Sequence, residues 1–347
     1  MTSATLLGGE AAREGAGAPP LHLRRGVIIL AAAAAASALA IMLAPGLSSF
    51  RSGFSGAELW LILIAAWAEA LSCVSYVLVF RSVFGETLDW RACAEIGFSE
   101  QAANSLLSAG GAGGLALGAW AMRRAGMRGK EIGGLTVAFF LLTSLANVGF
   151  LVLAGAALFS GAVSGPPERF LLGGVPALIG VTGIGLALLV GVVARFGARH
   201  RRDGVRAVAE SLEHGLAEAR GRVASPLALI GSAGYMLFDV AVLAICFPAF
   251  GFATPPLDAL LLAYLIGQLG GLLPLPAGIG GLDLGLVGAL ALYGSSATEA
   301  AVAVVAYRCV QLAVPTILGL PAFAVLRRHL GAATSRPAPE HDATTAR

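Results

Sequence analysis

Charged side chains are scarce in this chain. Asp, Glu, Lys and Arg make up 12% of its 347 residues, whereas hydrophobic residues make up 57%. A single soluble domain of this length needs much more charge to cover its exterior. With a mean hydropathy of +0.82, the composition excludes one soluble core and indicates a protein that lies in a lipid bilayer.

Signatures of soluble catalysis and of metal binding are also lacking. The sequence has no P-loop, no H-E-x-x-H, no G-x-S-x-G and no dinucleotide fingerprint after a strand. Its four cysteines show no metal-ligand spacing, and its five histidines all fall in polar loops or tails. We therefore expect no metal and no cofactor, and we do not expect an enzyme.

Lysine is nearly absent: Lys130 is the only one, and the other 22 basic residues are arginines. The basic residues cluster in short polar loops between apolar runs that are long enough to cross about 30 Å of hydrocarbon. These runs cover residues 26–44, 58–80, 131–159, 170–196, 226–250 and 298–326. The alternation predicts an all-α polytopic membrane protein.

The arginines also orient the predicted spans, because positive charge concentrates in the cytoplasmic loops of bacterial inner-membrane proteins. With Arg24 and Arg25 inside, every basic residue is cytoplasmic except Arg51, Arg169 and Arg308. Both termini are then cytoplasmic, and the first apolar run is expected to be retained as a helix rather than cleaved as a signal peptide.

The same loops divide the chain into segments. The predicted organisation is a cytoplasmic tail at 1–25, a first half at 26–159, an external loop at 160–168, a second half at 169–330 and a disordered cytoplasmic tail at 331–347. Within the second half, residues 197–224 combine basic residues with apolar residues at helical spacing. This pattern predicts an amphipathic helix on the cytoplasmic face, either as a linker or as a surface that binds lipid headgroups.

Glycine is abundant, with 47 residues, and some of it belongs to an element that occurs twice. The stretches "QAANSLLSAGGAGGLALG" from Gln101 and "QLGGLLPLPAGIGGLDLG" from Gln268 agree at eight of eighteen positions without a gap. Glycine-broken apolar segments at matching places in two halves of a chain point to the substrate site of a transporter-like membrane protein.

The positive loops place both ends of the first element in the cytoplasm and both ends of the second outside. Each element therefore has to enter the membrane and turn back, with its glycines as the break. The sequence predicts two halves of inverted topology, each with spanning helices and one glycine-broken re-entrant hairpin.

Four charged residues fall inside apolar segments, where a charge costs about 2.5–3.5 kcal/mol and is often functional. Glu69 and Asp239 lie at nearly equivalent places in the two halves, which would bring both to a central interface as structural, proton-coupling or headgroup-binding groups. Asp283 and Arg308 form either a structural ion pair or a site in which Arg308 donates to a lipid phosphate. Ala116 stands where Asp283 does in the repeat, so only the second hairpin is expected to carry a charge and recognise the headgroup.

Uncharged groups on the hairpins extend the candidate site. They comprise the hydrogen-bonding side chains of Gln101, Asn104 and Gln268, and the exposed half-helix N-termini near Gly278, Gly280 and Gly281, which suit an anionic headgroup. Close helix packing is the alternative role of these glycines.

The stretch "LPLPAGIGGLDLG", followed by "YRCVQLAVPTILGL", resembles the flippase-like transmembrane domain of the lysylphosphatidylglycerol synthases. The positions that match the Pro-Gly-Gly-x-Gly-x-x-Glu hairpin of that family and its later Tyr-Arg pair are Pro276, Gly278, Gly280, Asp283, Tyr307 and Arg308. Ala277 replaces a glycine and Asp283 a glutamate. In the first half the family often has a proline before its glycines and a basic residue after them; this sequence has Ser108 near the proline position and no basic residue between the glycines and Arg123.

The resemblance covers about residues 26–330 and implies lipid translocation. Full-length synthases carry a cytosolic aminoacyl-transferase domain after the membrane part, and we expect this chain to lack it and not to aminoacylate lipids. The function predicted is that of a flippase that moves an anionic, glycosylated or isoprenoid lipid across the inner membrane, with the lipid and the bilayer as partners and no nucleic acid. The alternatives are an intramembrane lipid-modifying enzyme using Glu69, Asp239 or Asp283, and a non-transporting scaffold for lipid-synthesis enzymes.

Overall fold

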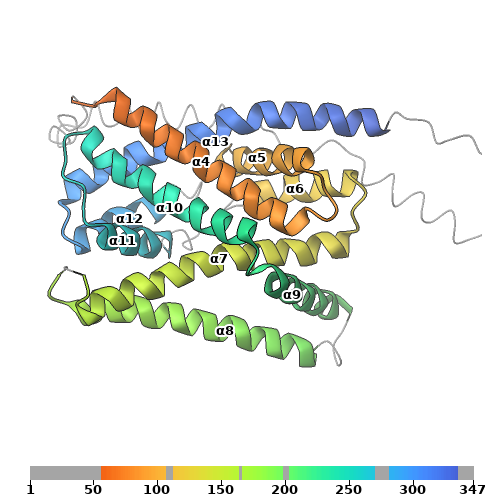
Figure 1. Ribbon diagram of the computed structural model, residues 1–347, viewed down its shortest axis with the longest axis horizontal. Helices are drawn as coiled ribbons and strands as arrows, with labels where there is room; N and C mark the ends of the chain where they lie inside the picture. The colour runs from red at the N-terminus through yellow and green to blue at the C-terminus, as the bar shows by residue number, and fades with distance from the viewer. Residues whose placement is uncertain (1–55, 107–111, 164–165, 198–202, 270–280, 335–347) are drawn as a thin grey trace, which may run out of the picture.

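The computed structural model describes residues 56–106, 112–163, 166–197, 203–269 and 281–334, and every element within these ranges is a helix (Figure 1). The elements are α4 (Leu59–Phe84), α5 (Trp90–Leu106), α6 (Ala112–Arg124), α7 (Gly129–Ser160), the π-helical turn η2 (Phe170–Gly174), α8 (Val175–Gly197), α9 (Asp203–Arg222), α10 (Pro226–Ala249), α11 (Leu257–Leu269), α12 (Gly281–Leu292) and α13 (Ala297–Thr334). The predicted all-α class is confirmed.

Within the described residues, the helices α4, α7, α10 and α13 are long and apolar enough to cross a bilayer. Their most apolar windows have mean hydropathies of 1.9 to 2.2. These four helices coincide with four of the six predicted spans. A chain with several such helices is a multi-pass membrane protein. Of the other two predicted spans, 170–196 is occupied by η2 and α8, and 26–44 lies outside the described residues.

The helices α4 and α10 pack antiparallel at the centre of the molecule. The Glu58 N–H beside the start of α4 donates to the Ala249 carbonyl at the end of α10 at 2.8 Å. A glycine allows the close approach: a Cβ added to Gly231 would lie 2.8 Å from the Val79 backbone nitrogen. Small residues at a crossing let two membrane helices pack backbone to backbone, and this crossing joins the two parts of the chain that carry the repeat.

Two pairs of shorter helices, α5 with α6 and α11 with α12, pack side by side. The helices α6, α11 and α12 have 13, 13 and 12 residues. At 1.5 Å per residue each is about 20 Å long or less, which is too short to cross a hydrocarbon core of about 30 Å. The described parts of the two copies of the repeated element, 101–106 with 112–118 and 268–269 with 281–285, therefore lie in these shorter helices and not in the four candidate spanning helices.

The two pairs open toward opposite ends of the molecule (Figure 1). Short connections place the start of α5 beside the end of α4, and the end of α6 beside the start of α7. The outer ends of α11 and α12 instead adjoin the end of α10 and the start of α13. There the Tyr293 hydroxyl donates to the Leu172 carbonyl at 2.6 Å.

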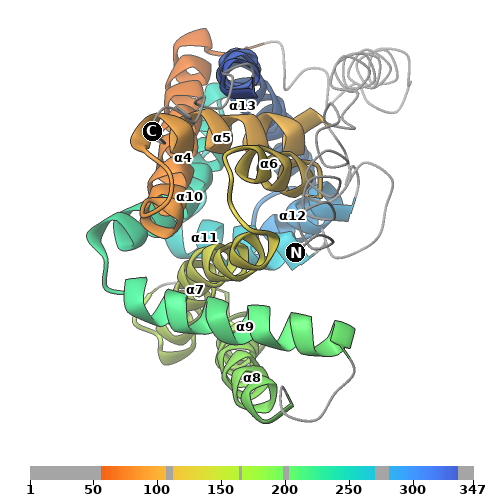
Figure 2. The same ribbon diagram turned by 90° about the vertical axis from the view of Figure 1, so that its right-hand side faces the viewer.

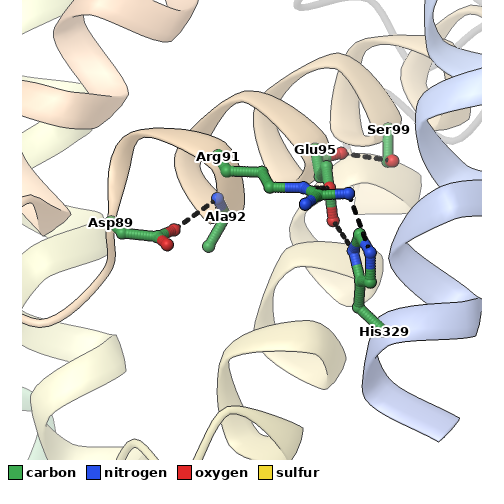
Figure 3. Close-up of polar contacts among 6 residues, drawn as sticks. All are labelled: Asp89, Arg91, Ala92, Glu95, Ser99 and His329. Carbon is green, nitrogen blue, oxygen red and sulfur yellow. Dashed lines mark hydrogen bonds and ion pairs between the residues drawn. The ribbon is translucent and has the colours of Figure 1, made fainter. Parts of the chain in front are cut away.

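A polar cluster fastens the end of α13 to the first turns of α5 (Figure 3). The Asp89 carboxylate accepts the Ala92 N–H at 2.7 Å and so caps α5. Glu95 contacts both Arg91 Nε and His329 Nδ1 at 2.9 Å, and Arg91 Nη2 lies 2.9 Å from His329 Nε2. Because His329 belongs to α13, these contacts hold the outer end of the α5–α6 pair against the last helix.

The basic, amphipathic segment predicted at 197–224 forms α9, which lies across α7 and α8 (Figure 2). Lys130 at the start of α7 forms a 2.6 Å ion pair with Glu210 of α9. Near the other end of α9, Arg222 Nε donates to the Ser82 carbonyl of α4 at 2.9 Å. The helix is thus held by protein contacts, and lipid-headgroup binding by its free surface stays a prediction.

Candidate functional site

The Asp239 carboxylate lies midway along α10 and is 6% exposed. It accepts hydrogen bonds from the hydroxyls of Tyr264 on α11 and Tyr307 on α13, the second at 3.0 Å. The amide Nε2 of Gln311, also on α13, donates to Asp239 Oδ2 at 3.3 Å. Three donors from two neighbouring helices offset the cost of removing this acid from water.

The helix α13 extends this hydrogen-bonded chain away from Asp239. Gln311 lies three residues after Arg308 and four after Tyr307, so its side chain neighbours both of theirs on the helix surface. Gln311 Nε2 donates to the Tyr307 hydroxyl at 2.6 Å, and Arg308 Nη1 donates to Gln311 Oε1 at 2.5 Å. The chain connects a buried acid to a guanidinium whose side chain is 21% exposed.

Arg308 and Asp283, which the sequence singled out as a pair, are in contact in the structure. Arg308 Nε lies 2.7 Å from Asp283 Oδ1, and the Asp283 side chain is 26% exposed. Asp283 stands in the first turn of α12, where the helix dipole favours a negative side chain. Nε and Nη1 of Arg308 are engaged, whereas Nη2 has no hydrogen-bond partner among the described residues. A partly exposed guanidinium with a spare donor is suited to bind an anion.

Glu69 lies on α4, at its contact with α10, and is 4% exposed. It interacts electrostatically with Asp239, so the two acids from equivalent segments do lie near each other. Within the described part of the chain, Glu69 Oε2 has no hydrogen-bond partner. A carboxylate oxygen left without a donor in a buried setting is unusual and is often explained by function.

A third buried acid, Glu100 on α5, was missed by the sequence analysis. Glu100 is 7% exposed, and its Oε2 accepts the Tyr76 hydroxyl of α4 at 2.8 Å. Its Oε1 occupies the space in which a Cβ on Gly118 of α6 would lie. The expectation that only the second hairpin carries a charge is therefore wrong, because the first holds a buried acid on its other arm.

The signal for Glu100 was present but lay one residue outside the repeat. The matched stretches begin at Gln101 and Gln268, and the residue that corresponds to Glu100 is Gly267. A comparison restricted to the repeat therefore excludes the acid. Counting charges over the whole arm "RACAEIGFSEQAANS" would have included it.

Glu100 also lines a cavity of about 150 Å³ between α4, α5, α6 and α7. The wall is largely aromatic, with Tyr76, Phe80, Phe84 and Phe139 among its residues. Three of these aromatic residues, at positions 76, 80 and 84, lie on successive turns of α4. The cavity therefore runs along that helix toward its C-terminal end. This volume is enough for several water molecules beside the acid.

The remaining predicted site residues differ in burial and in hydrogen-bond partners. Gln101 is buried, and its Nε2 donates to the Cys73 carbonyl at 3.3 Å. Asn104 is exposed, and its Oδ1 accepts the Gly114 N–H at 2.7 Å, which links α5 to α6. Gln268 is partly buried and is a hydrogen-bond partner of Tyr264. Gly281 begins α12, whereas Gly278 and Gly280 lie outside the described residues.

Across the described ranges, no group of three or more His, Cys, Asp or Glu side chains is arranged to hold a metal ion. The acids instead face hydroxyls, an amide and one guanidinium. Such an arrangement can bind an anion at Arg308 and can pass protons between oxygen atoms.

A family comparison agrees with the resemblance seen in the sequence. A family model described as the lysylphosphatidylglycerol synthase TM region matches residues 28–319, which is most of the chain. No curated protein matches it. The matched range contains Glu69, Glu100, Asp239, Asp283 and Arg308, so the buried acids and the ion pair all lie in the domain that the family defines.

Proposed function

The chain belongs to the family of the lysylphosphatidylglycerol synthase transmembrane region, and on this premise we propose that it translocates a lipid with a phosphate-bearing headgroup across a bacterial inner membrane. The membership and the four spanning helices support a role in membrane lipid biology. The proposed substrates are anionic phospholipids and glycosylated or isoprenoid lipid phosphates.

The observation that carries this proposal is the state of Arg308. Its guanidinium is held by Asp283 and Gln311, retains a donor at Nη2, and is partly exposed. A planar guanidinium matches the oxygens of a phosphate in a bidentate geometry. Because two neighbours fix its orientation, little rotamer entropy is lost when an anion binds.

The arrangement of the paired helices supports a pathway with two entrances. The α5–α6 pair and the α11–α12 pair open toward opposite ends of the molecule, and both end near the α4–α10 crossing. We propose that they are re-entrant hairpins of two halves with inverted topology, the first entered from the cytoplasm and the second from outside. Alternating exposure of the two hairpins would carry a headgroup past the centre of the bilayer.

Lipid translocation also fits the buried acids better than catalysis does. A general acid or base has to reach the substrate proton, yet Asp239 is enclosed by donors from Tyr264, Tyr307 and Gln311. We therefore propose a non-enzymatic function without nucleotide hydrolysis. Lipid mass spectrometry of a deletion strain would show a missing product if the protein were instead an enzyme.

Reconstitution into vesicles tests the proposal directly. Vesicles of phosphatidylethanolamine and phosphatidylglycerol would carry traces of headgroup-labelled fluorescent phospholipid or polyprenyl phosphate, and dithionite would bleach only the outer leaflet. We expect the purified protein to make the inner-leaflet probe accessible for at least one lipid class. Bleaching equal to that of protein-free vesicles for every class contradicts lipid translocation.

A matched pair of variants ties the activity to the site. Arg308→Ala removes the proposed phosphate donor, whereas Arg327→Ala removes an exposed arginine further along the same helix. Loss of one charge-assisted hydrogen bond costs about 1.5–3 kcal/mol, or roughly ten- to hundredfold in rate. We expect that loss for Arg308→Ala and wild-type rates for Arg327→Ala.

A further inference from the structure

Tyrosines lie beside and between the buried acids in the interior of the molecule. We define the polar seam as Glu100, Tyr76, Tyr235, Glu69, Asp239 and Tyr307. Tyr76 donates to Glu100 at 2.8 Å, and its ring lies 5.6 Å from that of Tyr235, centroid to centroid. Tyr235 in turn interacts electrostatically with Glu69 and Asp239, and Asp239 accepts from Tyr307 at 3.0 Å.

Most of the tyrosines of the chain lie in this region. The sequence has five tyrosines, and four of them, at positions 76, 235, 264 and 307, contact the acids or one another. Tyrosine in membrane proteins usually gathers at the two water interfaces. Here the hydroxyls gather instead around acids in the interior.

A purely structural role leaves two features of the seam unexplained. An acid kept for structure is normally paired with a cation or saturated with donors. Among the described residues, Glu69, Glu100 and Asp239 form no ion pair with Lys or Arg. Within the described ranges Glu69 Oε2 has no donor, and Glu100 accepts a hydrogen bond from the Tyr76 hydroxyl. Carboxylate oxygens with so few donors can take up a proton or accept a hydrogen bond from a water molecule.

The titratable and charged groups that face Glu69 come from three helices. Cys73 lies one turn along α4, Asp239 and Tyr235 lie on α10, and Tyr307 lies on α13. Arg308 interacts with Asp239 from α13, and Tyr264 donates to it from α11. Apart from Arg308, which is already paired with Asp283, every one of these neighbours is neutral or acidic.

The two ends of the seam reach different hairpins. At one end Glu100 lines the 150 Å³ cavity that runs along α4 toward its end at Phe84. At the other end Tyr307 is linked through Gln311 to Arg308 and Asp283, whose side chains are partly exposed. Because the hairpins open at opposite ends of the molecule, a line of acids and hydroxyls leads from one entrance toward the other. Rows of acidic side chains serve as proton relays in pumps and transporters.

We propose that the polar seam conducts protons between the two hairpins, and that proton movement drives the lipid step. The coupling half of this proposal rests on the proposed function, whereas proton conduction does not. Protons pass between acids and hydroxyls directly where these are hydrogen-bonded, and through bridging water across the gaps on either side of Tyr235. Only O–H bonds form and break: each proton that enters at the Glu100 end leaves the Asp239–Tyr307 end through water, while Gln311 and Arg308 keep their N–H protons.

Proton conduction can be measured without knowing the lipid. The full-length protein in vesicles of phosphatidylethanolamine and phosphatidylglycerol, loaded with pyranine, would be given a potassium diffusion potential with valinomycin. We expect proton entry above that of protein-free vesicles. Glu69→Gln should lower the protein-dependent flux by about tenfold or more, because the amide cannot carry an acid proton. Glu69→Asp should restore part of it.

Controls separate a local effect from misfolding. Glu58→Gln changes an exposed acid beside the start of the same helix and should keep the wild-type flux. If Glu69→Gln does not elute as a single folded species, Tyr76→Phe and Glu100→Gln test the other end of the seam in the same assay. Unchanged flux in all folded seam variants, or wild-type flux equal to that of protein-free vesicles, overturns proton conduction.

Parallel lipid assays distinguish this proposal from the proposed function. The dithionite assay would be run with and without an imposed pH gradient. Translocation that neither the gradient nor Glu69→Gln alters leaves the lipid function standing and rejects coupling. Proton flux that depends on Glu69, with no translocation of any probe, leaves conduction standing and rejects the lipid function.

Discussion

The α5–α6 and α11–α12 pairs, which we propose to be re-entrant hairpins, share a sequence pattern but carry their acids on opposite arms. In the first, Glu100 lies on the incoming helix α5 and Ala116 on the outgoing helix α6. In the second, Gly267 stands on the incoming helix and Asp283 on the outgoing one. The first acid is buried and is held by a tyrosine hydroxyl, whereas the second is partly exposed and is held by an arginine. The two copies share glycine and leucine positions in sequence, whereas their acids differ in position and in partner.

Each half of the chain also contains one hydrogen bond between a tyrosine hydroxyl and a buried carboxylate. In the first half α4 supplies the hydroxyl of Tyr76 and the hairpin supplies the acid. In the second half α10 supplies the acid Asp239 and the hairpin supplies the hydroxyl of Tyr264. Each half thus joins its spanning helix to its hairpin through one such bond, with donor and acceptor exchanged. Equivalent places need not carry equivalent residues for an interaction to recur.

The largest expected effect concerns the faces to which the hairpins open. In a background without the four native cysteines, Ala125→Cys marks the outer end of α6 and Ala297→Cys the outer end of α12; both alanines are exposed. With a membrane-impermeant maleimide on intact spheroplasts, we expect labelling of the second variant alone. Permeabilised cells provide the control, in which both should react. Labelling of both, or of neither, from outside would contradict inverted topology.

The next effect separates the two acids by function. Asp283→Asn weakens the ion pair that orients Arg308, and loss of a charged partner costs about 1.5–3 kcal/mol, or ten- to hundredfold in translocation at equal pH on both sides. Glu100→Gln should lower that rate less, because Glu100 has no contact with Arg308 among the described interactions. The dithionite assay on both variants decides the order. A larger loss for Glu100→Gln would move headgroup recognition to the first hairpin.

A smaller effect, on stability, compares a glycine from each hairpin. A Cβ on Gly114 would lie 2.6 Å from the Glu100 carbonyl, whereas one on Gly288 would meet nothing within 4 Å. Overpacking costs about 1–3 kcal/mol, and a helical glycine in open space gains up to about 1 kcal/mol when replaced by alanine. Thermal unfolding in detergent should therefore show Gly114→Ala below and Gly288→Ala at or above the wild type. Equal shifts would contradict the close packing of α6 against α5 at Gly114.

The smallest effect compares the two tyrosine hydroxyls. Tyr76→Phe removes the hydroxyl that donates to Glu100, whereas Tyr264→Phe leaves Asp239 with Tyr307 and Gln311 as donors. A buried acceptor left without a partner costs about 1–3 kcal/mol, and the loss of one donor among several costs about 1 kcal/mol. Denaturant titration should rank Tyr76→Phe as the more destabilised. The reverse order would indicate that Glu100 finds another donor.

Much of the fold was predictable because its signals are local. Hydropathy over about twenty residues locates a spanning helix, and four predicted spans coincide with α4, α7, α10 and α13. The amphipathic segment at 197–224 likewise contains α9, because its charge and apolar spacing are read along a single helix. The predicted domain boundaries and the inverted orientation remain predictions, since they depend on the sides of a membrane.

The sequence by itself determined that the protein lies in a membrane, where its four candidate spanning helices run, and which two glycine-rich segments repeat each other. Tertiary structure alone decided the partners of the buried acids: Tyr264 and Tyr307 are 25 and 68 residues from Asp239, and Tyr76 is 24 from Glu100. Burial and helix formation follow from the solvent and from neighbours within a few residues, so composition and spacing encode them. A hydrogen bond between helices depends on how they cross and turn against each other, which small residues such as Gly231 permit but which no local pattern specifies.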